Sequence, residues 1–558
     1  MDSKAFLAIA LSFILFMLWQ IYFAPPVQHP PEEQKQTTAP QAPPKTAPAP
    51  VPVPENLVPK AASSPHVDLS TLKTWTMGDS LFKMQVVDQG ARESSFTLKK
   101  FRETVAPDSP PIQMISTRDT LDLPLSIDLL HHQDWQLSTR PYSSDAPTEV
   151  KVPVGGEPQN ISFHTEVPGK VQVTKTFTVT PDSYVVDVAI AIKNLLNEKL
   201  VDQVGISFYY KPYADTTYYN PSQLTFYEKG SLKYFKEKDL KSNENPKDLP
   251  QPPYDWVGYE NNYFIQALVP PPEGGYQILP RLLDQEKGVI RTVYLSDPME
   301  LAQGETKTIK LRLYTGPKQI DYLKKAGHNL SASVDYGWFS FLAKPLLVVL
   351  KLFNSFVHNY GVAIILLTVL IKLIFWPLTH KSYTSMQKMK KVQPKIQQLR
   401  EKYKDNREKL NQELMQVYKT HKVNPLGGCL PMALQIPVFF ALYRMLYAAV
   451  DLRHQPFMLW INDLTAPDRL HVGFSVNLPF LGHLDGIPVL TILMGITMFL
   501  QQKMTPSTGD PRQEKIMLIM PVMFTFFFIN FPSGLVLYWF INNILSIAQQ
   551  YWINRHAA

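Results

Sequence analysis

The stretch GVAIILLTVLIKLIFWPLTHKSY, residues 361–383, decides the fold of this chain. It carries most of an apolar run of about 20 residues, the length that crosses a bilayer as a helix, and we predict a span over residues 356–376. Lys372 interrupts this run. An intramembrane lysine costs roughly 2.5–3.5 kcal/mol on insertion scales, whereas each Leu or Ile returns only about 0.3–0.6 kcal/mol. The span tolerates the lysine, but its charge needs an explanation.

Two explanations for Lys372 are open. The side chain could snorkel, because Lys372 lies four residues before Trp376, about 6 Å of helical rise from the predicted cytoplasmic end. Alternatively, the ammonium faces a wet interior, as intramembrane charges usually do, with Thr368 one turn away on the same face. Polar residues of other predicted spans could line that interior, although each is more often a helix–helix contact; they are Gln435, Asn542, Asn543 and Ser546.

Five further apolar segments lie before and after this span in the sequence. Four follow it in the chain, and packed helices tolerate the prolines that several of them contain. The fifth, residues 1–23, is N-terminal; a cleaved signal peptide is the alternative, but no small-x-small cleavage site precedes Pro25 and Pro26, so we predict an anchor. The total is six spans, the later four being 427–449, 487–502, 516–531 and 534–553.

The region between the first two predicted spans has a different sequence pattern. Residues 24–65 are proline-rich, which favours an extended tether. Residues 66–318 alternate apolar and polar positions in short runs such as KVQVTKTFTVT, typical of antiparallel strands, and we predict an extracytoplasmic β-sandwich domain. Its tyrosine-rich stretch 208–219 could line a ligand groove or simply pack the sheets. Residues 334–352 mix aromatic side chains with lysine and proline, which indicates an interfacial amphipathic helix.

The segment 380–425 sets the predicted topology. It holds 12 Lys and Arg against 4 Asp and Glu, a balance that marks a cytoplasmic loop. Its apolar residues recur at helical spacing on either side of a turn near Asn406, so we predict a mobile hairpin of two short helices. Both chain termini are then cytoplasmic and the β domain lies outside.

No enzyme site is recognisable in the sequence. Walker A, GxGxxG, HExxH and GxSxG motifs are missing, so we expect no catalytic residues, no cofactor and no metal site. Cys429 is the only cysteine, which excludes an intrachain disulfide and a CxxC site. Apart from Asp2 at the start of the N-terminal segment, the predicted spans hold no Asp or Glu, which argues against an ion-coupled pump.

Two motifs carry a resemblance to a known family: YTSMQKMKKVQPKIQQLREKYKDNREKLNQELMQVYKTHKVNPLGGCLPMALQIPVFFALY, and FFINFPSGLVLYWFINNILSIAQQ. Over about 334–553 the chain resembles the YidC/Oxa/Alb family of membrane protein insertases, in its Gram-negative inner-membrane form. The resemblance implies a core of five helices around a hydrophilic groove that is closed toward the outside and open to cytoplasm and lipid. The hairpin is similar to the family's mobile cytoplasmic region, and the β domain to its periplasmic supersandwich.

The resemblance also implies site residues. The family's positive groove residue falls on Lys372, where arginine is usual, and its substrate-contacting positions fall on Thr368 and on Trp539, where tyrosine is common. With the polar residues noted above, the expected substrate groove comprises Lys372, Thr368, Gln435, Trp539 and Asn542. Residues 466–486 are longer than the family's shortest versions of this external loop, and we assign them no role.

The hypothesis is therefore a bacterial inner-membrane insertase and chaperone for nascent membrane proteins, not an enzyme. The expected partners are those clients, the lipid bilayer, the Sec translocon and, through the basic loops, the ribosome, with no DNA. One rival is a small-anion transporter or channel that uses Lys372 as its binding charge. An inverted repeat would favour this rival, but the sequence shows no such repeat. A second rival is an adaptor whose hairpin docks ribosomal RNA, although lipid headgroups explain the same charge excess.

Overall fold

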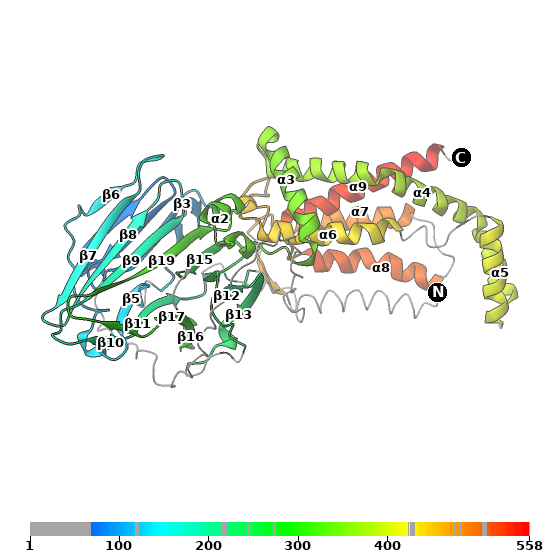
Figure 1. Ribbon diagram of the computed structural model, residues 1–558. Helices are drawn as coiled ribbons and strands as arrows, with labels where there is room; N and C mark the ends of the chain where they lie inside the picture. The colour runs from blue at the N-terminus through cyan, green and yellow to red at the C-terminus, as the bar shows by residue number, and fades with distance from the viewer. Residues whose placement is uncertain are drawn as a thin grey trace, which may run out of the picture. The chain divides into compact units, whose positions relative to one another are not determined.

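The computed structural model shows two compact units, one ending at Val334 and the other beginning at Asp335 (Figure 1). The predicted anchor (1–23) and linker (24–65) lie outside the described residues. The structure describes residues 69–556 except for gaps at 118–121, 214–215, 217–219, 243–245, 247, 272–274, 405, 422, 424–429, 474, 479–481 and 505–510.

The first unit is built on an eight-stranded antiparallel sheet, whose strands run in the spatial order β13-β12-β14-β15-β19-β9-β8-β7. Their bounds are Ser231–Phe235, Gln223–Glu228, Trp256–Glu260, Phe264–Val269, Thr306–Pro317, Val185–Asn194, Val171–Val179 and Gln159–Val167. As the sequence predicted, the alternating runs form strands: KVQVTKTFTVT forms β8, SYVVDVAIAI (183–192) begins β9 and KTIKLRLYTG (307–316) forms most of β19. The three strands are neighbours in the sheet. In β8 every second side chain is buried, which is how a half-buried strand presents one face to a core.

Three smaller sheets complete this unit. A five-stranded sheet has the order β4-β3-β2-β1-β6, with bounds Pro111–Gln113, Arg92–Arg102, Phe82–Val87, Thr74–Gly78 and Glu149–Lys151. A four-stranded sheet has the order β16-β17-β11-β5, with bounds Tyr276–Asp284, Val289–Ser296, Val204–Tyr210 and Ser126–Leu129. Strands β10 (Leu200–Asp202) and β18 (Met299–Leu301) pair separately, and helix α2 (Ile320–Ala326) follows β19. Figure 1 shows β5, β11, β16 and β17 as a layer beside the eight-stranded sheet.

The tyrosine-rich stretch packs the core in its described part. Tyr209, Tyr210 and Tyr213 are all buried. The ring of Tyr210 stacks on Tyr259 of β14 at 5.0 Å between centroids, so it joins two sheets. Packing therefore accounts for these side chains without a ligand, while residues 217–219 lie outside the described residues.

One lysine sits wholly inside the β unit. Lys175 of β8 has none of its surface exposed. Its Nζ donates to the carbonyls of Gly90 and Leu125, both at 2.6 Å, and to that of Ala91 at 3.3 Å. Burial lowers the pKa of Lys175 well below its ordinary value. Three backbone acceptors thus replace water around this nitrogen and tie the smaller sheets to the large one.

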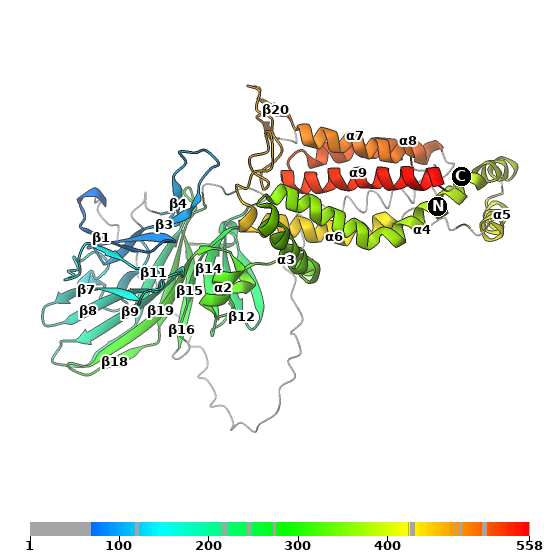
Figure 2. The same cartoon turned by 90° about the horizontal axis from the view of Figure 1, so that it is seen from above.

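The second unit is helical, and Figure 2 shows α4, α6, α7, α8 and α9 running roughly side by side. Helix α6 covers residues 430–448 of the predicted span 427–449, of which residues 427–429 lie outside the described residues. A two-stranded β-hairpin, β20 (Val476–Leu478) and β21 (Gly482–Leu484), lies between α6 and α7. The helix bounds are α3 Ser340–Val357, α4 Tyr360–Lys402, α5 Arg407–Thr420, α6 Leu430–Ala448, α7 Val489–Met504, α8 Pro511–Phe528 and α9 Ser533–His556.

Among the residues that the structure describes, two helical segments are long and apolar enough to cross a membrane, 337–357 and 360–402. Three shorter apolar helices lie at 434–448, 489–504 and 517–528 in the described part of the chain. The segment 334–352, predicted to lie in the interface, thus contributes to a helix that reaches Val357 and meets the length for a span. Its outward-facing Phe341, Val348 and Phe356 remain exposed.

Helix α4 differs from the prediction. A break was expected between the span 356–376 and the hairpin starting at residue 380, but α4 is one helix of 43 residues that contains Pro377 and Pro394. It begins at Asn359, whose side chain accepts from the Val362 amide as an N-cap. Proline is tolerated within a helix when neighbouring helices hold it, and α4 is bonded to α9 on both sides of Pro377, as described below.

The predicted hairpin seam is present. Val392 and Ile396 of α4 pack with Val423, and Met389, Leu414, Val417 and Tyr418 lie against them. Asn406 at the turn caps α5 by accepting from the Lys409 amide. The helical spacing predicted Met389, Val392, Ile396, Leu399 and Tyr403, and then Leu410, Leu414 and Val417, for this seam. The observed cluster contains five of these eight residues, and Tyr418 and Val423 join them in place of Leu399, Tyr403 and Leu410.

A buried ion pair generates the first prediction. Lys318, just after β19, lies 3.1 Å from Glu260 at the end of β14, and their side chains are 8% and 2% exposed. Removing one partner of a buried pair strands the other charge, so we expect Lys318→Met to lower the free energy of unfolding of the β unit by about 3–5 kcal/mol. Pulse proteolysis of the full-length protein along a urea series measures this change.

The matched control is Lys199→Met. Lys199 pairs with Glu300 at 3.6 Å, but both side chains are largely exposed, so its loss should change the stability by less than about 1 kcal/mol. The double variant Lys318→Met/Glu260→Gln should recover part of the loss. Equal stability of Lys318→Met and Lys199→Met would refute the assignment.

Candidate functional site

Lys372 lies in the middle of α4 and faces α9. Its Nζ donates to Ser546 Oγ at 2.6 Å and to Asn542 Oδ1 at 3.2 Å. Helices α6, α7 and α9 contain no Asp or Glu. The ammonium is therefore held by neutral oxygens of the neighbouring helix, an arrangement that favours the interior explanation over snorkelling toward the helix end.

The contact with α9 continues along α4. Thr379 Oγ1 accepts from Gln549 Nε2 at 2.9 Å, and both side chains are buried. One helical turn before Ser546, Asn542 also accepts from the Ser546 hydroxyl through its backbone carbonyl, at 2.7 Å. Further on, Gln387 donates to Asn554. We call this row the polar seam; it comprises Lys372, Thr379 and Gln387 of α4 and Asn542, Ser546, Gln549 and Asn554 of α9.

The other predicted site residues form a second group. Gln435 of α6 donates to the Tyr538 hydroxyl at 3.4 Å, and Tyr538 lies one turn from Asn542 on α9. Trp539 packs against Phe439 of α6 at 5.0 Å and against Phe528 of α8 at 5.2 Å between ring centroids. The structure thus places Gln435 and Trp539 between α6, α8 and α9, adjacent in α9 to the polar seam.

Thr368 is buried but makes only a local hydrogen bond. Its hydroxyl donates to the Ile364 carbonyl of the preceding turn at 2.7 Å. Such a back-bond satisfies a hydroxyl within an apolar helix without a partner on another helix. Of the five predicted residues, Lys372 and Asn542 are therefore in direct contact, Gln435 and Trp539 lie nearby on a second surface, and Thr368 lies one turn before Lys372 on α4.

Five seam residues were missing from the predicted site, namely Thr379, Gln387, Ser546, Gln549 and Asn554, although Ser546 had been named as a possible lining residue of the interior. Ser546 makes the shorter bond to Lys372, and Thr379 and Gln549 form the next contact along the two helices. A signal existed, because Ser546 and Gln549 follow Asn542 at positions i+4 and i+7, which is one face of a helix. On α4, Thr379 follows Lys372 at the same i+7 spacing.

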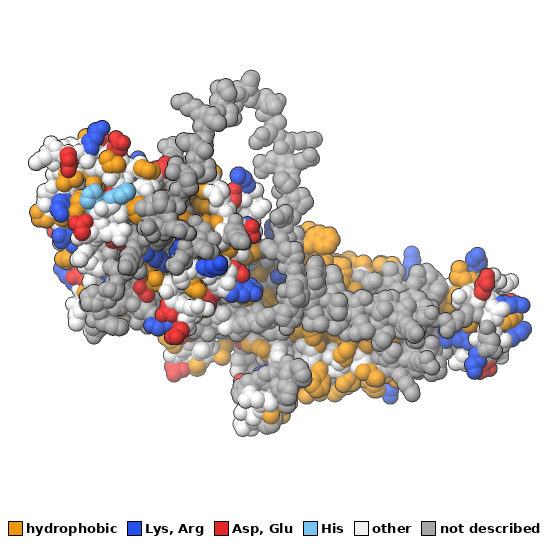
Figure 3. Space-filling view, turned by 90° about the horizontal axis from the view of Figure 1, so that it is seen from below, with side chains coloured by type: hydrophobic (Ala, Val, Ile, Leu, Met, Phe, Trp, Pro, Cys, Tyr) orange, Lys and Arg blue, Asp and Glu red, His pale blue; other side chains and the backbone are white. Residues whose placement is uncertain are grey.

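The outer surface of the helical unit is strongly apolar. Ile496 of α7 and Ile519, Val522 and Phe526 of α8 are each more than half exposed. Figure 3 shows hydrophobic side chains along the described face of this unit, while Lys and Arg gather at the end that α5 forms. Side chains of this kind pack against hydrocarbon in a membrane.

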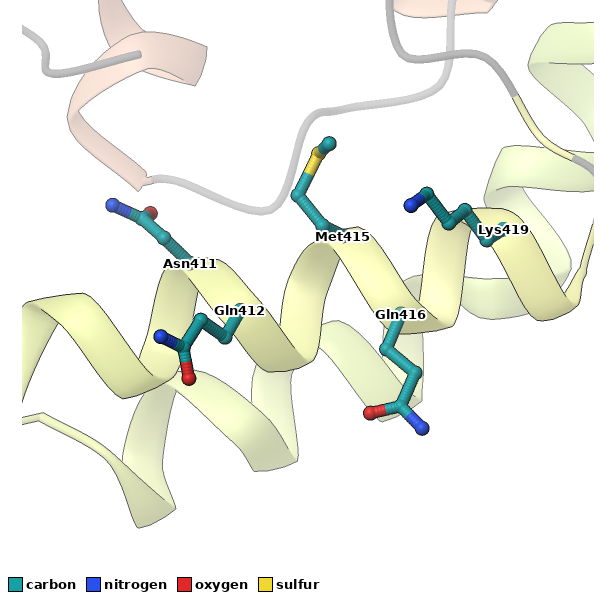
Figure 4. Close-up of a pocket in the computed structure, with 5 residues that line it drawn as sticks. All are labelled: Asn411, Gln412, Met415, Gln416 and Lys419. Atoms are coloured by element: carbon teal, nitrogen blue, oxygen red, sulfur yellow. The ribbon is translucent and has the colours of Figure 1, made fainter.

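A shallow depression lies on the hairpin, lined by Asn411, Gln412, Met415, Gln416 and Lys419. Figure 4 shows that all five belong to α5 and project to different sides of it. A surface made by one helix encloses no ligand, so we assign it no binding role. Within the described ranges, no group of three His, Cys, Asp or Glu side chains is arranged to hold a metal ion.

Comparison with known proteins covers both units. A family model described as the YidC periplasmic domain matches residues 74–349, and one described as the 60Kd inner membrane protein matches residues 352–558. A relative from Syntrophobacter fumaroxidans, named membrane protein insertase YidC, is 57% identical over 564 residues and matches 100% of both chains. A relative of the same name from Syntrophus aciditrophicus is 39% identical over 570 residues, again over 100% of both chains.

Solved structures match as well, and one of them covers most of the chain. It is described as an active YidC insertase crystal structure with the first transmembrane domain resolved. The match covers 86% of this chain and 94% of that chain, at 17% identity and a TM-score of 0.37.

The polar seam generates the second prediction. Thr379→Val removes the hydroxyl that Gln549 bonds, which leaves a buried amide without that partner. We expect a loss of about 0.6–1.7 kcal/mol, the range of interhelical hydrogen bonds in membranes. The double variant Thr379→Val/Gln549→Leu should be more stable than the single one, because it leaves no stranded polar group.

Unfolding of the purified protein in mixed detergent micelles measures these differences. Thr384→Val is the matched control, because the Thr384 hydroxyl bonds only the His380 carbonyl of its own helix among the contacts described. If Thr379→Val and Gln549→Leu lower the stability additively in the double variant, the side chains of Thr379 and Gln549 are not in contact.

Proposed function

The chain belongs to the YidC family of membrane protein insertases, and we propose that it inserts nascent membrane proteins by means of the polar seam between α4 and α9. Members of this family are inner-membrane proteins with a periplasmic domain, and their function is insertion rather than catalysis. The β-sheet unit corresponds to that periplasmic domain, and the helical unit to the membrane region.

A single observation carries the proposal: the Lys372 ammonium is held by Asn542 and Ser546, two neutral side chains. A carboxylate adds to the hydrogen bond a direct Coulomb attraction for the ammonium, which a neutral oxygen lacks. An acidic segment of a client that reached Lys372 would therefore displace these partners. When the segment leaves, Asn542 and Ser546 would again take the ammonium, so the charge is never left bare in the membrane.

The client would bind only transiently. In the proposed cycle, its short hydrophilic segment enters a hydrated groove beside the polar seam, which shortens the path through hydrocarbon. Its apolar segment then moves into lipid past α7 and α8, whose outer faces carry the exposed Ile496, Ile519 and Phe526. Burial of that apolar segment in the bilayer drives the step, without nucleotide hydrolysis. The membrane potential assists the transfer of an acidic segment toward a positive outside.

The neighbouring aromatic surface would guide the apolar part of the client. Trp539 lies between α6 and α8, and Gln435 and Tyr538 form the polar contact beside it. A client helix passing here would meet rings on one side and the polar seam on the other. We propose Thr368, one turn before Lys372, as a further lining residue of the groove.

The proposal includes six spans and a topology. The anchor 1–23 would be the first span, α4, α6, α7, α8 and α9 the remaining five, and α3 would rest in the outer interface. Both termini and the basic hairpin would face the cytoplasm, in accord with the excess of Lys and Arg over acidic residues in 380–425. Through that hairpin the protein would contact the ribosome, and beside the membrane region it would cooperate with the Sec translocon.

Insertion of an acid-tailed single-span client into proteoliposomes tests the role of Lys372. We expect Lys372→Arg to retain insertion, whereas Lys372→Met and Lys372→Glu should reduce its rate by about ten- to a hundredfold, the equivalent of losing a charge-assisted hydrogen bond. A client whose acidic tail residues are replaced by lysine should be inserted better by Lys372→Glu than by the wild type.

Lys344→Met is the matched control, because it removes the same charge from an exposed position on α3. Equal insertion by the wild type, Lys372→Met and Lys372→Glu would show that the charge does not act on clients. Chloride efflux from the same vesicles, abolished in Lys372→Met, would instead support the small-anion transporter.

A further inference from the structure

The loop after α6 forms a structure to which the proposed function gives no role. Residues 450–470 run from the end of α6 to the β20–β21 hairpin, and we call them the outer clasp. Its side chains include Leu452, Leu464 and Asp468, each 1% exposed or less. A loop with charged side chains this deeply buried is a fixed part of the fold rather than a loose connection.

Asp468 caps the beginning of α7. Its Oδ2 accepts from the Thr491 amide at 3.0 Å, within the first turn of α7. Its Oδ1 accepts from Trp460 Nε1 at 2.7 Å. The first amides of a helix lack partners inside the helix, and a carboxylate there also interacts favourably with the helix dipole. Asp468 supplies that cap from a distant part of the chain.

Arg469, the next residue, caps the end of α8. Its Nη1 donates to the Ile529 carbonyl at 2.8 Å, directly after the last residue of α8, and its Nη2 donates to Asn530 Oδ1 at 2.9 Å. A cation at a helix C-terminus complements the negative end of the dipole. The side chain is 9% exposed, so these contacts are made away from water. Asp468 and Arg469 thus join the adjacent ends of α7 and α8.

The outer clasp also reaches α9. The Ser533 amide donates to the Ala466 carbonyl at 2.8 Å, and the Gly534 amide donates to the Leu464 carbonyl at 2.9 Å. These are the first amides of α9, which have no partner within the helix. The Ser533 hydroxyl adds a bond to the Asp463 carbonyl at 2.8 Å.

The same loop meets the beginning of α4. Asn359 Nδ2 donates to the Phe457 carbonyl at 3.0 Å. The Phe457 ring lies so close to Gly361 that a Cβ there would be 2.0 Å from it, which only glycine avoids. Backbone groups or capping side chains at one end of α4, α7, α8 and α9 are therefore bonded to the outer clasp.

The opposite end of the helical unit is built differently. The polar seam extends from Lys372, in the middle of α4, toward Gln387 and away from the outer clasp. Helix α4 follows the periplasmic unit in the chain, so its beginning lies on the extracytoplasmic side in the topology proposed above. A client entering beside the polar seam would thus find its path closed at the outer helix ends.

We propose that the outer clasp is the extracytoplasmic permeability seal of the insertase, and that Asp468 and Arg469 are the residues that position it. This proposal rests on the proposed function, which requires a hydrated groove. Parting α7 or α8 from the outer clasp would strand the buried Asp468 carboxylate or the Arg469 guanidinium. The clasp therefore keeps ions from following the client, while the polar seam remains accessible from inside.

Passive ion leak through proteoliposomes tests the seal. An imposed pH gradient is allowed to collapse in vesicles that contain the full-length protein, and a trapped pH-sensitive dye gives the rate. We expect Asp468→Asn and Arg469→Gln to raise the protein-dependent leak about tenfold, the population shift that corresponds to about 1.4 kcal/mol. Arg469→Lys keeps a cation near the Ile529 carbonyl and should restore most of the tightness.

Asp485→Asn is the matched control for Asp468→Asn, because Asp485 is 52% exposed and its carboxylate lies 3.5 Å from Arg469 Nε. It should leak like the wild type. Only variants that elute as folded monodisperse protein are reconstituted. If Arg469→Gln fails to fold, the nearly isosteric Asp468→Asn variant alone tests the proposal. A folded Asp468→Asn protein as tight as the wild type overturns the proposal. Client insertion is measured separately in the same vesicles. If the wild type inserts no client while the variants still leak, the result contradicts the proposed function alone.

Discussion

An ammonium group inside an apolar helical bundle has to be solvated by protein groups, and this requirement organises the helical unit. Lys372 obtains its partners from α9, where Asn542 and Ser546 lie on one face one turn apart. To present them, α9 must adopt one rotation relative to α4, and the contact between Thr379 and Gln549 follows from the same rotation. The position of one charge thereby sets how the first and last core helices pair.

Lys175 and Lys372 show how the acceptors decide the role of a lysine. Lys175 is surrounded by the backbone carbonyls of Gly90, Ala91 and Leu125, which belong to the fold and cannot be exchanged without moving it. Lys372 is held by side chains, which can rotate away and return. The first arrangement stabilises a sandwich core, and the second leaves a charge that a passing carboxylate can take over.

Helix α4 connects the parts of the helical unit. It starts at the Asn359 cap beside the outer clasp, carries Lys372 in its middle, and ends in the apolar seam with α5. Because it passes Pro377 without ending, the charged site and the basic hairpin belong to one element. The end at which one loop binds four helices and the long opposite end make the unit asymmetric, which suits the one-sided entry proposed above.

The sequence by itself determined the layout: alternation placed β8, β9 and β19, apolar runs and the charge excess of 380–425 located the helical unit and its hairpin, and Lys372 stood out as a charge within a span. These are local properties, read over one or two turns or strands. The tertiary structure decided the rest. Ser546 and Asn542 lie 174 and 170 residues from Lys372, and helices that are apolar nearly all round carry no strong stripe to set their rotation. The continuity of α4 and the bonding of four helix ends to one loop likewise depend on contacts between distant segments, which no local pattern encodes.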